Sequence, residues 1–182
     1  MRPGEAAAVR WCDYDPAAQP LGRLKVNRAF SSRMRKVKST KTGRARLVPV
    51  HPVLAGMLAE WRKTGWKEWM RRDPQDGDLV VPNRFGNNRQ STSSLRQFHA
   101  DLCMLDLRRR RHYDTRRTFI SMALDGGASY VHTMYLTHAP PQQEFWKYVT
   151  HEWQSLCGVM TCIRLPGRSA SAGDRDVVDI AA

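Results

Sequence analysis

Five side chains whose types can act on a phosphodiester are spread along the chain: Arg2, Lys41, Arg116, His138 and Tyr148. The planar guanidinium of an arginine matches the oxygens of a phosphate and keeps its positive charge. A lysine or a histidine can donate a proton or a hydrogen bond, and the phenol of a tyrosine becomes a nucleophile when it ionises. Gathered in one site, these groups would suit a transesterification at phosphorus, so the elements that carry them must bring them together.

Each of these residues also has a plainer interpretation. Arg2 and Lys41 can be ordinary solvated cations, and the histidine of the set can be a turn residue before a Pro-Pro pair. Tyr148 competes as a nucleophile with Tyr130 and Tyr135. Tyr135 falls inside an apolar helical pattern, which favours a place in the core.

The charge of the whole chain indicates the kind of partner. Its 182 residues hold 30 Lys and Arg against 17 Asp and Glu, a formal net charge of +13. Such an excess points to a polyanion, most simply a nucleic acid. No apolar run has the roughly 18 residues of a membrane helix, and the amino end lacks the layout of a signal peptide, so we expect a cytoplasmic chain with no membrane partner. The four cysteines show no zinc-ligand spacing, which predicts free thiols and no metal.

Positive charge is densest between residues 23 and 46, which hold ten Lys and Arg and no acid. Apolar residues alternate with polar or basic ones over 21–30 and 46–50, which predicts two antiparallel strands. The turn chemistry of residues 39–43 would join them, with Lys41 at the tip of a basic hairpin. The residues expected to contact phosphates are Arg35, Lys36, Lys38, Arg44, Arg46 and, outside this stretch, Arg117.

Apolar spacing predicts that most of the remaining chain is helical. Helices are expected from about residue 3 to residue 11, from 52 to the residue before Asp73-Pro74, from a cap at Ser93 or Ser94 to 105, around 118–124 up to Gly126-Gly127, at 131–136 and at 144–157. The expected fold is therefore α+β, mostly helical, with one small antiparallel sheet. It would form a single domain over residues 1–162, followed by a flexible tail over 163–182.

The chain resembles a known family at separate places along its length. The motifs are Arg2-Pro3-Gly4-Glu5 followed by Val9-Arg10-Trp11, Thr40-Lys41-Thr42-Gly43 followed by Arg46 to Pro52, Arg116-Arg117-Thr118-Phe119, Leu136-Thr137-His138, and Tyr148-Val149-Thr150. In this order they resemble the catalytic domain of the tyrosine recombinases, the phage integrase family. The ten-residue step from His138 to Tyr148 is close to the family's usual step.

The resemblance implies a site-specific recombinase that cleaves and rejoins double-stranded DNA during integration or recombination. Tyr148 would attack a DNA phosphorus and form a 3′-phosphotyrosyl bond. Arg2, Arg116 and His138 would hold the phosphate, and Lys41 would protonate the leaving 5′ oxygen. The reaction implied needs no metal, nucleotide or other cofactor, and the chain would act on DNA as a homo-oligomer.

One position departs from the pattern of the family. A His or Lys usually stands three residues before the second arginine, whereas Tyr113 stands three before Arg116 here. His112 is displaced by one residue, or about 100° around a helix. Tyr113 is the expected occupant because the match from Arg116 to Phe119 is contiguous, and His112 is the alternative.

The first helix of the family's catalytic domain and its separate DNA-clamping domain also have no counterpart in the sequence, which predicts an N-terminally truncated catalytic domain. Two other functions therefore stay open. One is a catalytically impaired, DNA-binding remnant of an integrase from a mobile element. The other is an unrelated basic RNA-binding protein.

Overall fold

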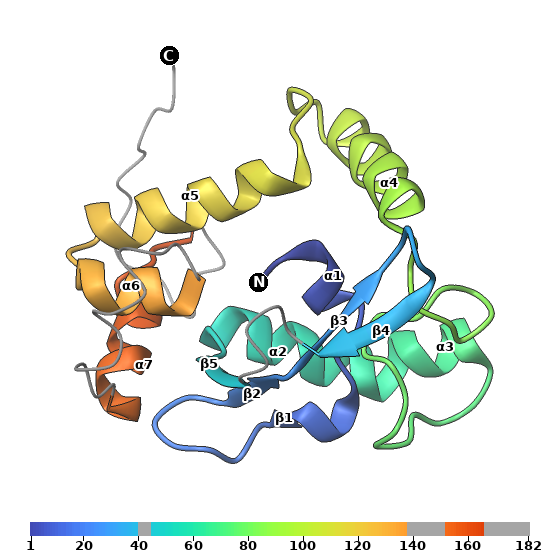
Figure 1. Ribbon diagram of the computed structural model, residues 1–182, viewed down its shortest axis with the longest axis horizontal. Coiled ribbons are helices and arrows are strands. Elements are labelled where there is room, and N and C mark those ends of the chain that lie inside the picture. The colour runs from blue at the N-terminus through green and yellow to red at the C-terminus, as the bar shows by residue number, and fades with distance from the viewer. Residues whose placement is uncertain (40–44, 138–151, 166–182) are drawn as a thin grey trace, which may run out of the picture.

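The computed structural model describes residues 1–39, 45–137 and 152–165, and its architecture is mixed α+β, the class that the sequence predicts, with two small antiparallel sheets where one was expected. Figure 1 shows the strands and the short helices of the first half together, with the longer helices α4 and α5 beyond them. The helical elements are α1 (Pro3–Ala6), the 3-10 turn η1 (Trp11–Asp13), α2 (Pro52–Glu60), the π-helical η2 (Trp61–Gly65), α3 (Trp66–Met70), α4 (Ser91–Met104), α5 (His112–Asp125), α6 (Tyr130–Thr137) and α7 (Trp153–Thr161).

The strands form two antiparallel ladders instead of one simple hairpin. They are β1 (Tyr14–Asp15), β2 (Arg23–Val26), β3 (Arg28–Ser31), β4 (Lys36–Ser39) and β5 (Arg46–Pro49). One sheet has the order β1-β2-β5, and the other pairs β3 with β4. Along the chain, Asn27 alone lies between β2 and β3, whereas residues 40–45 lie between β4 and β5.

This register adds a hairpin that the sequence analysis did not expect. The turn between β3 and β4 lies at residues 32–35, where Arg35 adopts a positive φ of 49°. The segment 39–43 was expected to join strands over 21–30 and 46–50, and β2 and β5 do pair antiparallel within those ranges. Ser39, the first residue of that segment, pairs with Arg28 inside β4. Because Lys41 follows β4 rather than β3, it belongs to the connection between the two ladders and lies outside the described residues.

Several helices start or end where the local chemistry indicates. The helical run that begins at Pro52 ends at Met70, and Gly126-Gly127 ends α5 with Gly127 at a φ of +87°. Other boundaries differ from expectation: α4 begins at Ser91 with Gln90 as its N-cap, not with Ser93 or Ser94. The helix expected at 144–157 is described only from residue 152, where Glu152 is the extended N-cap of α7 and the helix begins at Trp153.

Two apolar clusters form the core. One joins β2, η1 and α3 through residues such as Trp11, Val26 and Trp66. The other joins α5, α6 and α7 and includes Ala123, Leu136 and Ile163. Since Ile163 is only 8% exposed, the packed part of the chain continues past residue 162, where the tail was expected to begin.

The apolar side of α2 is less buried than its pattern predicts. Leu58 and Trp61 pack against the first cluster, but Leu54 and Met57 are 46% and 63% exposed. Leu105, expected on the buried face of α4, is 67% exposed. The pattern therefore gives the correct helices here but not their burial.

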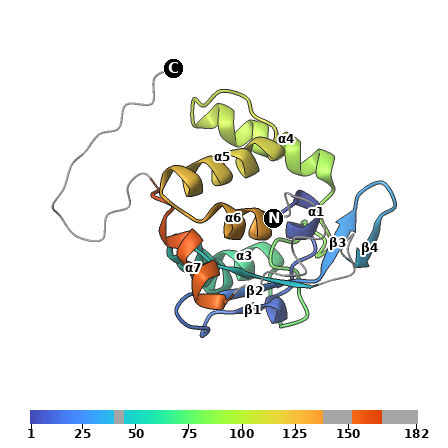
Figure 2. The same cartoon turned by 60° about the vertical axis from the view of Figure 1, so that its left-hand side comes forward.

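The two clusters meet through β5, because α7 packs against that strand while α6 packs against both α5 and α7. Figure 2 shows α4 and α5 above α1, with the β3–β4 hairpin extending to one side. The amino end of the chain consequently lies between the helices of the second half and the strands of the first half.

Candidate functional site

Arg2 is held at the start of α1 by contacts of its backbone. Its N–H donates to Glu5 Oε2 at 2.8 Å, and its carbonyl accepts from the N–H groups of Glu5 and Ala6 at 3.0 Å each. Gly4 lets this turn lie directly on β3, because a Cβ at that position would stand 2.6 Å from the carbonyl oxygen of Phe30. The backbone is therefore fixed while the side chain of Arg2 is exposed.

Arg116 comes from the distant helix α5 and is 8% exposed. Within the described residues, its Nη1 is buried and has no hydrogen-bond partner. Burial is the main cause that lowers the pKa of Arg116 from its ordinary value, and the nearby positive charges of Arg2 and Arg46 lower it further, while Tyr113 and Glu5 act in the opposite direction. A guanidinium in this condition is only partly compensated, so an anion bound beside it would be stabilised.

Arg46 corrects an expectation of the sequence analysis. It was expected to contact DNA, but its side chain is 3% exposed. Its Nη1 and Nη2 donate to the two carboxylate oxygens of Glu5 at 3.1 and 2.7 Å. These hydrogen bonds, with that from the Arg2 N–H, outweigh the effect of burial and hold the pKa of Glu5 below its ordinary value. Arg46 thus fixes Glu5, and through it the turn that carries Arg2.

Sequence reasoning missed this ion pair, although one signal was present. Arg46 pairs with Val26 and Val48 pairs with Leu24 in the β2–β5 ladder. Since alternate residues of a strand share a face, Arg46 points to the buried side together with Val48. A basic residue in an inward register predicts a buried carboxylate partner, but its identity as Glu5 was not visible in the sequence.

Both candidates for the family's histidine position lie in the first turn of α5. The guanidinium of Arg116 stands 5.9 Å from the ring centroid of Tyr113, which is 56% exposed. The ring of His112 packs against Phe98 at 5.2 Å and lines a pocket together with Arg2. Tyr113 thus lies beside Arg116, whereas His112 shares only a pocket with Arg2.

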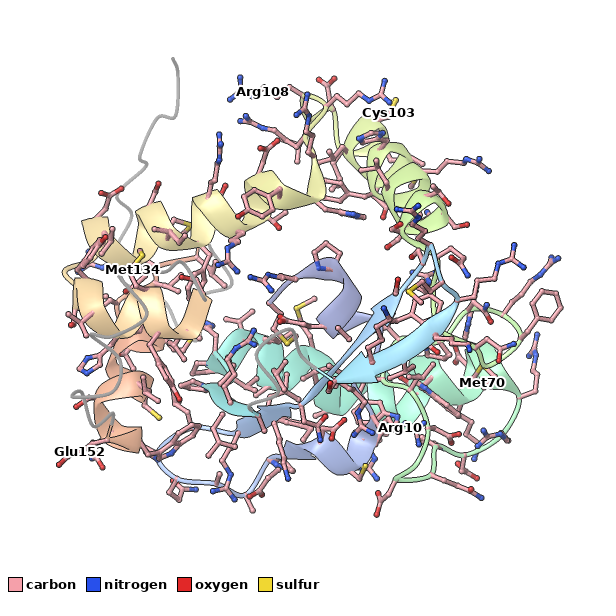
Figure 3. All side chains as sticks on the ribbon, viewed as in Figure 1. Arg10, Met70, Cys103, Arg108, Met134 and Glu152 are labelled. Atoms are coloured by element: carbon pink, nitrogen blue, oxygen red, sulfur yellow. The ribbon has the colours of Figure 1, made fainter. Side chains whose placement is uncertain are left out.

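The remaining expected phosphate contacts are exposed where the structure describes them. Lys36 and Lys38 lie opposite Ser31 and Ala29 in the β3–β4 ladder, on the face away from the buried Phe30. Arg35 is exposed in the turn of that hairpin, and Arg117 is exposed on α5. In Figure 3, Arg108 and Cys103 lie at the far end of α4, away from α1.

Lys41, Arg44, His138 and Tyr148 lie outside the described residues. Their chain neighbours are placed: Ser39 ends β4, Thr137 ends α6 and Glu152 precedes α7. The structure therefore brings Arg2, Arg116 and either Tyr113 or His112 together, whereas the convergence of the other expected catalytic residues stays a prediction.

Compared with known proteins, the chain matches no family model, no curated protein and no solved structure. In the described ranges, no group of three or more His, Cys, Asp and Glu side chains is arranged to hold a metal ion. No helix there is both long enough and apolar enough to cross a membrane.

Proposed function

We propose that this chain binds double-stranded DNA in the cytoplasm and cleaves and rejoins it as the catalytic domain of a tyrosine recombinase. The observation that carries the proposal is Arg116, a nearly buried guanidinium whose Nη1 has no hydrogen-bond partner among the described residues and whose positive charge interacts with that of Arg2 near the amino end of the chain. Two guanidinium groups in this relation suit the non-bridging oxygens of one phosphate. The motif resemblance supports the same assignment.

The proposed reaction is a reversible transesterification. The phenolate oxygen of Tyr148 attacks a DNA phosphorus, a 3′-phosphotyrosyl bond forms, and the bond from phosphorus to the 5′ oxygen breaks. Lys41 gives its proton to that oxygen, which leaves as a 5′ hydroxyl. Arg2, Arg116 and His138 stabilise the charge that develops on the phosphate, and the same steps in reverse join a new 5′ hydroxyl on an assembled homo-oligomer.

The experiment uses a nicked DNA substrate that traps the covalent intermediate. The unmodified chain should give an adduct that maps to Tyr148, and Tyr148→Phe should abolish it, because this change removes only the attacking oxygen. Tyr130→Phe is the control, since Tyr130 is exposed and lies outside the proposed site. An adduct that survives Tyr148→Phe, or one that maps to Tyr135, would overturn the assignment of the nucleophile.

A DNA-binding chain that does not cleave is the second candidate, and the identity of residue 113 favours it. A tyrosine replaces the basic residue that the family usually carries there, and loss of a base near neutral pKa lowers such rates by about 10²-fold or more. Salt-sensitive binding of duplex DNA without any adduct would support this candidate. A strong preference for RNA over duplex DNA would contradict both and favour an RNA-binding function.

A further inference from the structure

A pocket of about 250 Å³ opens beside Arg2, between α1, α4 and α5. We propose that it binds the sugar-phosphate of a single nucleotide, with Arg89 as the phosphate-binding residue. The inference deepens the proposed function and rests on it, because the nucleotide would be the neighbour, along one DNA strand, of the phosphate held by Arg2 and Arg116.

The polar wall of the pocket suits a phosphate. It carries the side chains of Arg2, Arg89 and His112 and the hydroxyl-bearing residues Ser94 and Thr115, and none of the described residues that line it is a carboxylate. Neither arginine forms an ion pair with a described carboxylate, unlike Arg46. Two guanidinium groups, with the Ser94 hydroxyl and the His112 imidazole beside them, match the oxygens of a phosphate monoester or diester. The Thr115 hydroxyl is not one of these donors, because it donates to the carbonyl oxygen of His112 at 2.6 Å.

The opposite wall is apolar and suits the sugar. It consists of Met1, of Pro3, Ala6 and Ala7 from α1 and its end, and of Val81, which follows the buried Val80. These side chains offer a sugar ring apolar contact. The combination of a cationic wall and a narrow apolar wall distinguishes a nucleotide from a free inorganic anion, which would gain nothing from the second wall.

Arg89 is held in position by hydrogen bonds on both sides of it. Asn88 Nδ2 donates to the carbonyl oxygen of Ala7 at 2.8 Å, which joins the loop to α1. The N–H of Ser91 donates to Ser32 Oγ at 2.9 Å, which joins the start of α4 to the β3–β4 hairpin. The loop that carries Arg89 is therefore fixed to two other elements, and Arg89 lines the pocket. Because the loop is already ordered, ligand binding costs little conformational entropy of its backbone.

The first arm of the test uses thymidine 5′-monophosphate, with uncharged thymidine as the comparison, and follows the amide signals of Ala6, Ala7 and Thr115 by NMR. The nucleotide should shift these signals and bind at least about 10-fold more tightly than thymidine, because charge-assisted hydrogen bonds between its phosphate and the arginine contribute most of the affinity. Arg89→Ala should weaken its binding about 5-fold or more, and Arg89→Lys should restore part of it. Arg84→Ala is the matched control, since Arg84 lies in the same loop but is exposed and stacks on Phe85 instead.

The second arm measures duplex DNA binding by the same variants. Arg89→Ala should lower the salt dependence by about one phosphate contact, and Arg84→Ala should leave it unchanged. Equal effects of the two variants, or nucleotide-induced shifts confined to other amides, would overturn the inference while leaving recombinase activity to be judged by the Tyr148 adduct. Nucleotide binding at the pocket in a chain that neither binds duplex DNA nor forms an adduct would keep the inference and reject the proposed function.

Discussion

At the scale of single residues, the site depends on an arginine that does not face solvent. Arg46 and Glu5 share two hydrogen bonds at 3% exposure each, and the backbone of Arg2 is bonded to the same carboxylate. One acid thus compensates one arginine, while Arg2 and Arg116 remain available to an anion. A buried ion pair is weak evidence for stability in itself, but removing one partner leaves the other charge buried.

We therefore predict that Arg46→Met destabilises the fold far more than removal of an exposed arginine. The variant leaves the Glu5 carboxylate buried without its partner, which should lower the free energy of unfolding by about 3–5 kcal/mol. Urea denaturation measures this change. Arg117→Met, at an exposed position of α5, is the control, and its free energy of unfolding should stay within about 0.5 kcal/mol of that of the parent chain.

The double variant Glu5→Gln/Arg46→Met separates this explanation from a simple loss of packing. Because it removes both charges, it should recover much of the stability lost in Arg46→Met. A double variant no more stable than the single one would contradict the role of the uncompensated carboxylate.

At the scale of elements, α5 and α7 meet at a point where only a glycine fits. A Cβ on Gly126 would stand 2.0 Å from the carbonyl oxygen of Cys162, a backbone atom that cannot rotate away. This contact joins the end of the helix that carries Arg116 to the end of α7. The second core cluster, which includes Ile163, lies directly beneath it.

Gly126→Ala should accordingly lower the free energy of unfolding by about 1–3 kcal/mol, the usual cost of overpacking. Gly158→Ala in α7 is the matched control, since nothing lies within 4 Å of its added Cβ. That change should raise stability by up to about 1 kcal/mol, because alanine favours a helix interior. Thermal denaturation of both variants measures the difference, and an equal response at the two positions would rule out the close approach at Gly126.

The elements also show where local sequence chemistry is sufficient and where it is not. The end of α5 was predictable because a Gly-Gly pair stops a helix, and the start of α2 was predictable from Pro52. The turn at 32–35 was missed because 21–30 was expected to be one strand, whereas β2 and β3 pair in two different ladders on either side of Asn27. Burial of α2 was overestimated, since an apolar pattern states a preference for the core without showing that a partner is present.

At the scale of the whole molecule, the candidate site is formed by segments that are distant in sequence. Arg2 is the N-cap of α1, Arg46 lies in β5 and Arg116 lies in α5. Strand β5 packs against both core clusters through Val48, and α5 contributes Ala123 to the second cluster. The residue types were predictable from phosphate chemistry, but the difference between exposed Arg2 and buried Arg46 depends on the register of β5 and the close contact at Gly4. Long-range contacts of this kind are not encoded in any local window of the chain.

The exposed cations lead to a prediction for the molecule as a whole. Arg35, Lys36, Lys38 and Arg117 are exposed, and Arg2 and Arg89 lie near the site without an acidic partner among the residues that the structure describes. If about five to eight phosphates are contacted, raising the salt concentration from 50 to 200 mM should weaken duplex binding by roughly 10²- to 10⁴-fold, because counterions are released on binding. Fluorescence anisotropy across this range measures the slope.

Two pairs of charge-removing variants test which cations make these contacts. Lys36→Gln/Lys38→Gln should lower the salt slope by about two contacts, because both lysines face solvent on β4. Arg23→Gln/Lys67→Gln removes the same net charge from residues already paired with Asp15 and Asp73, so it should change the slope little. Equal salt slopes for the two variants would mean that DNA binding depends on net charge alone. An affinity of the parent chain that barely changes with salt would show that the phosphate backbone is not the main ligand of this surface.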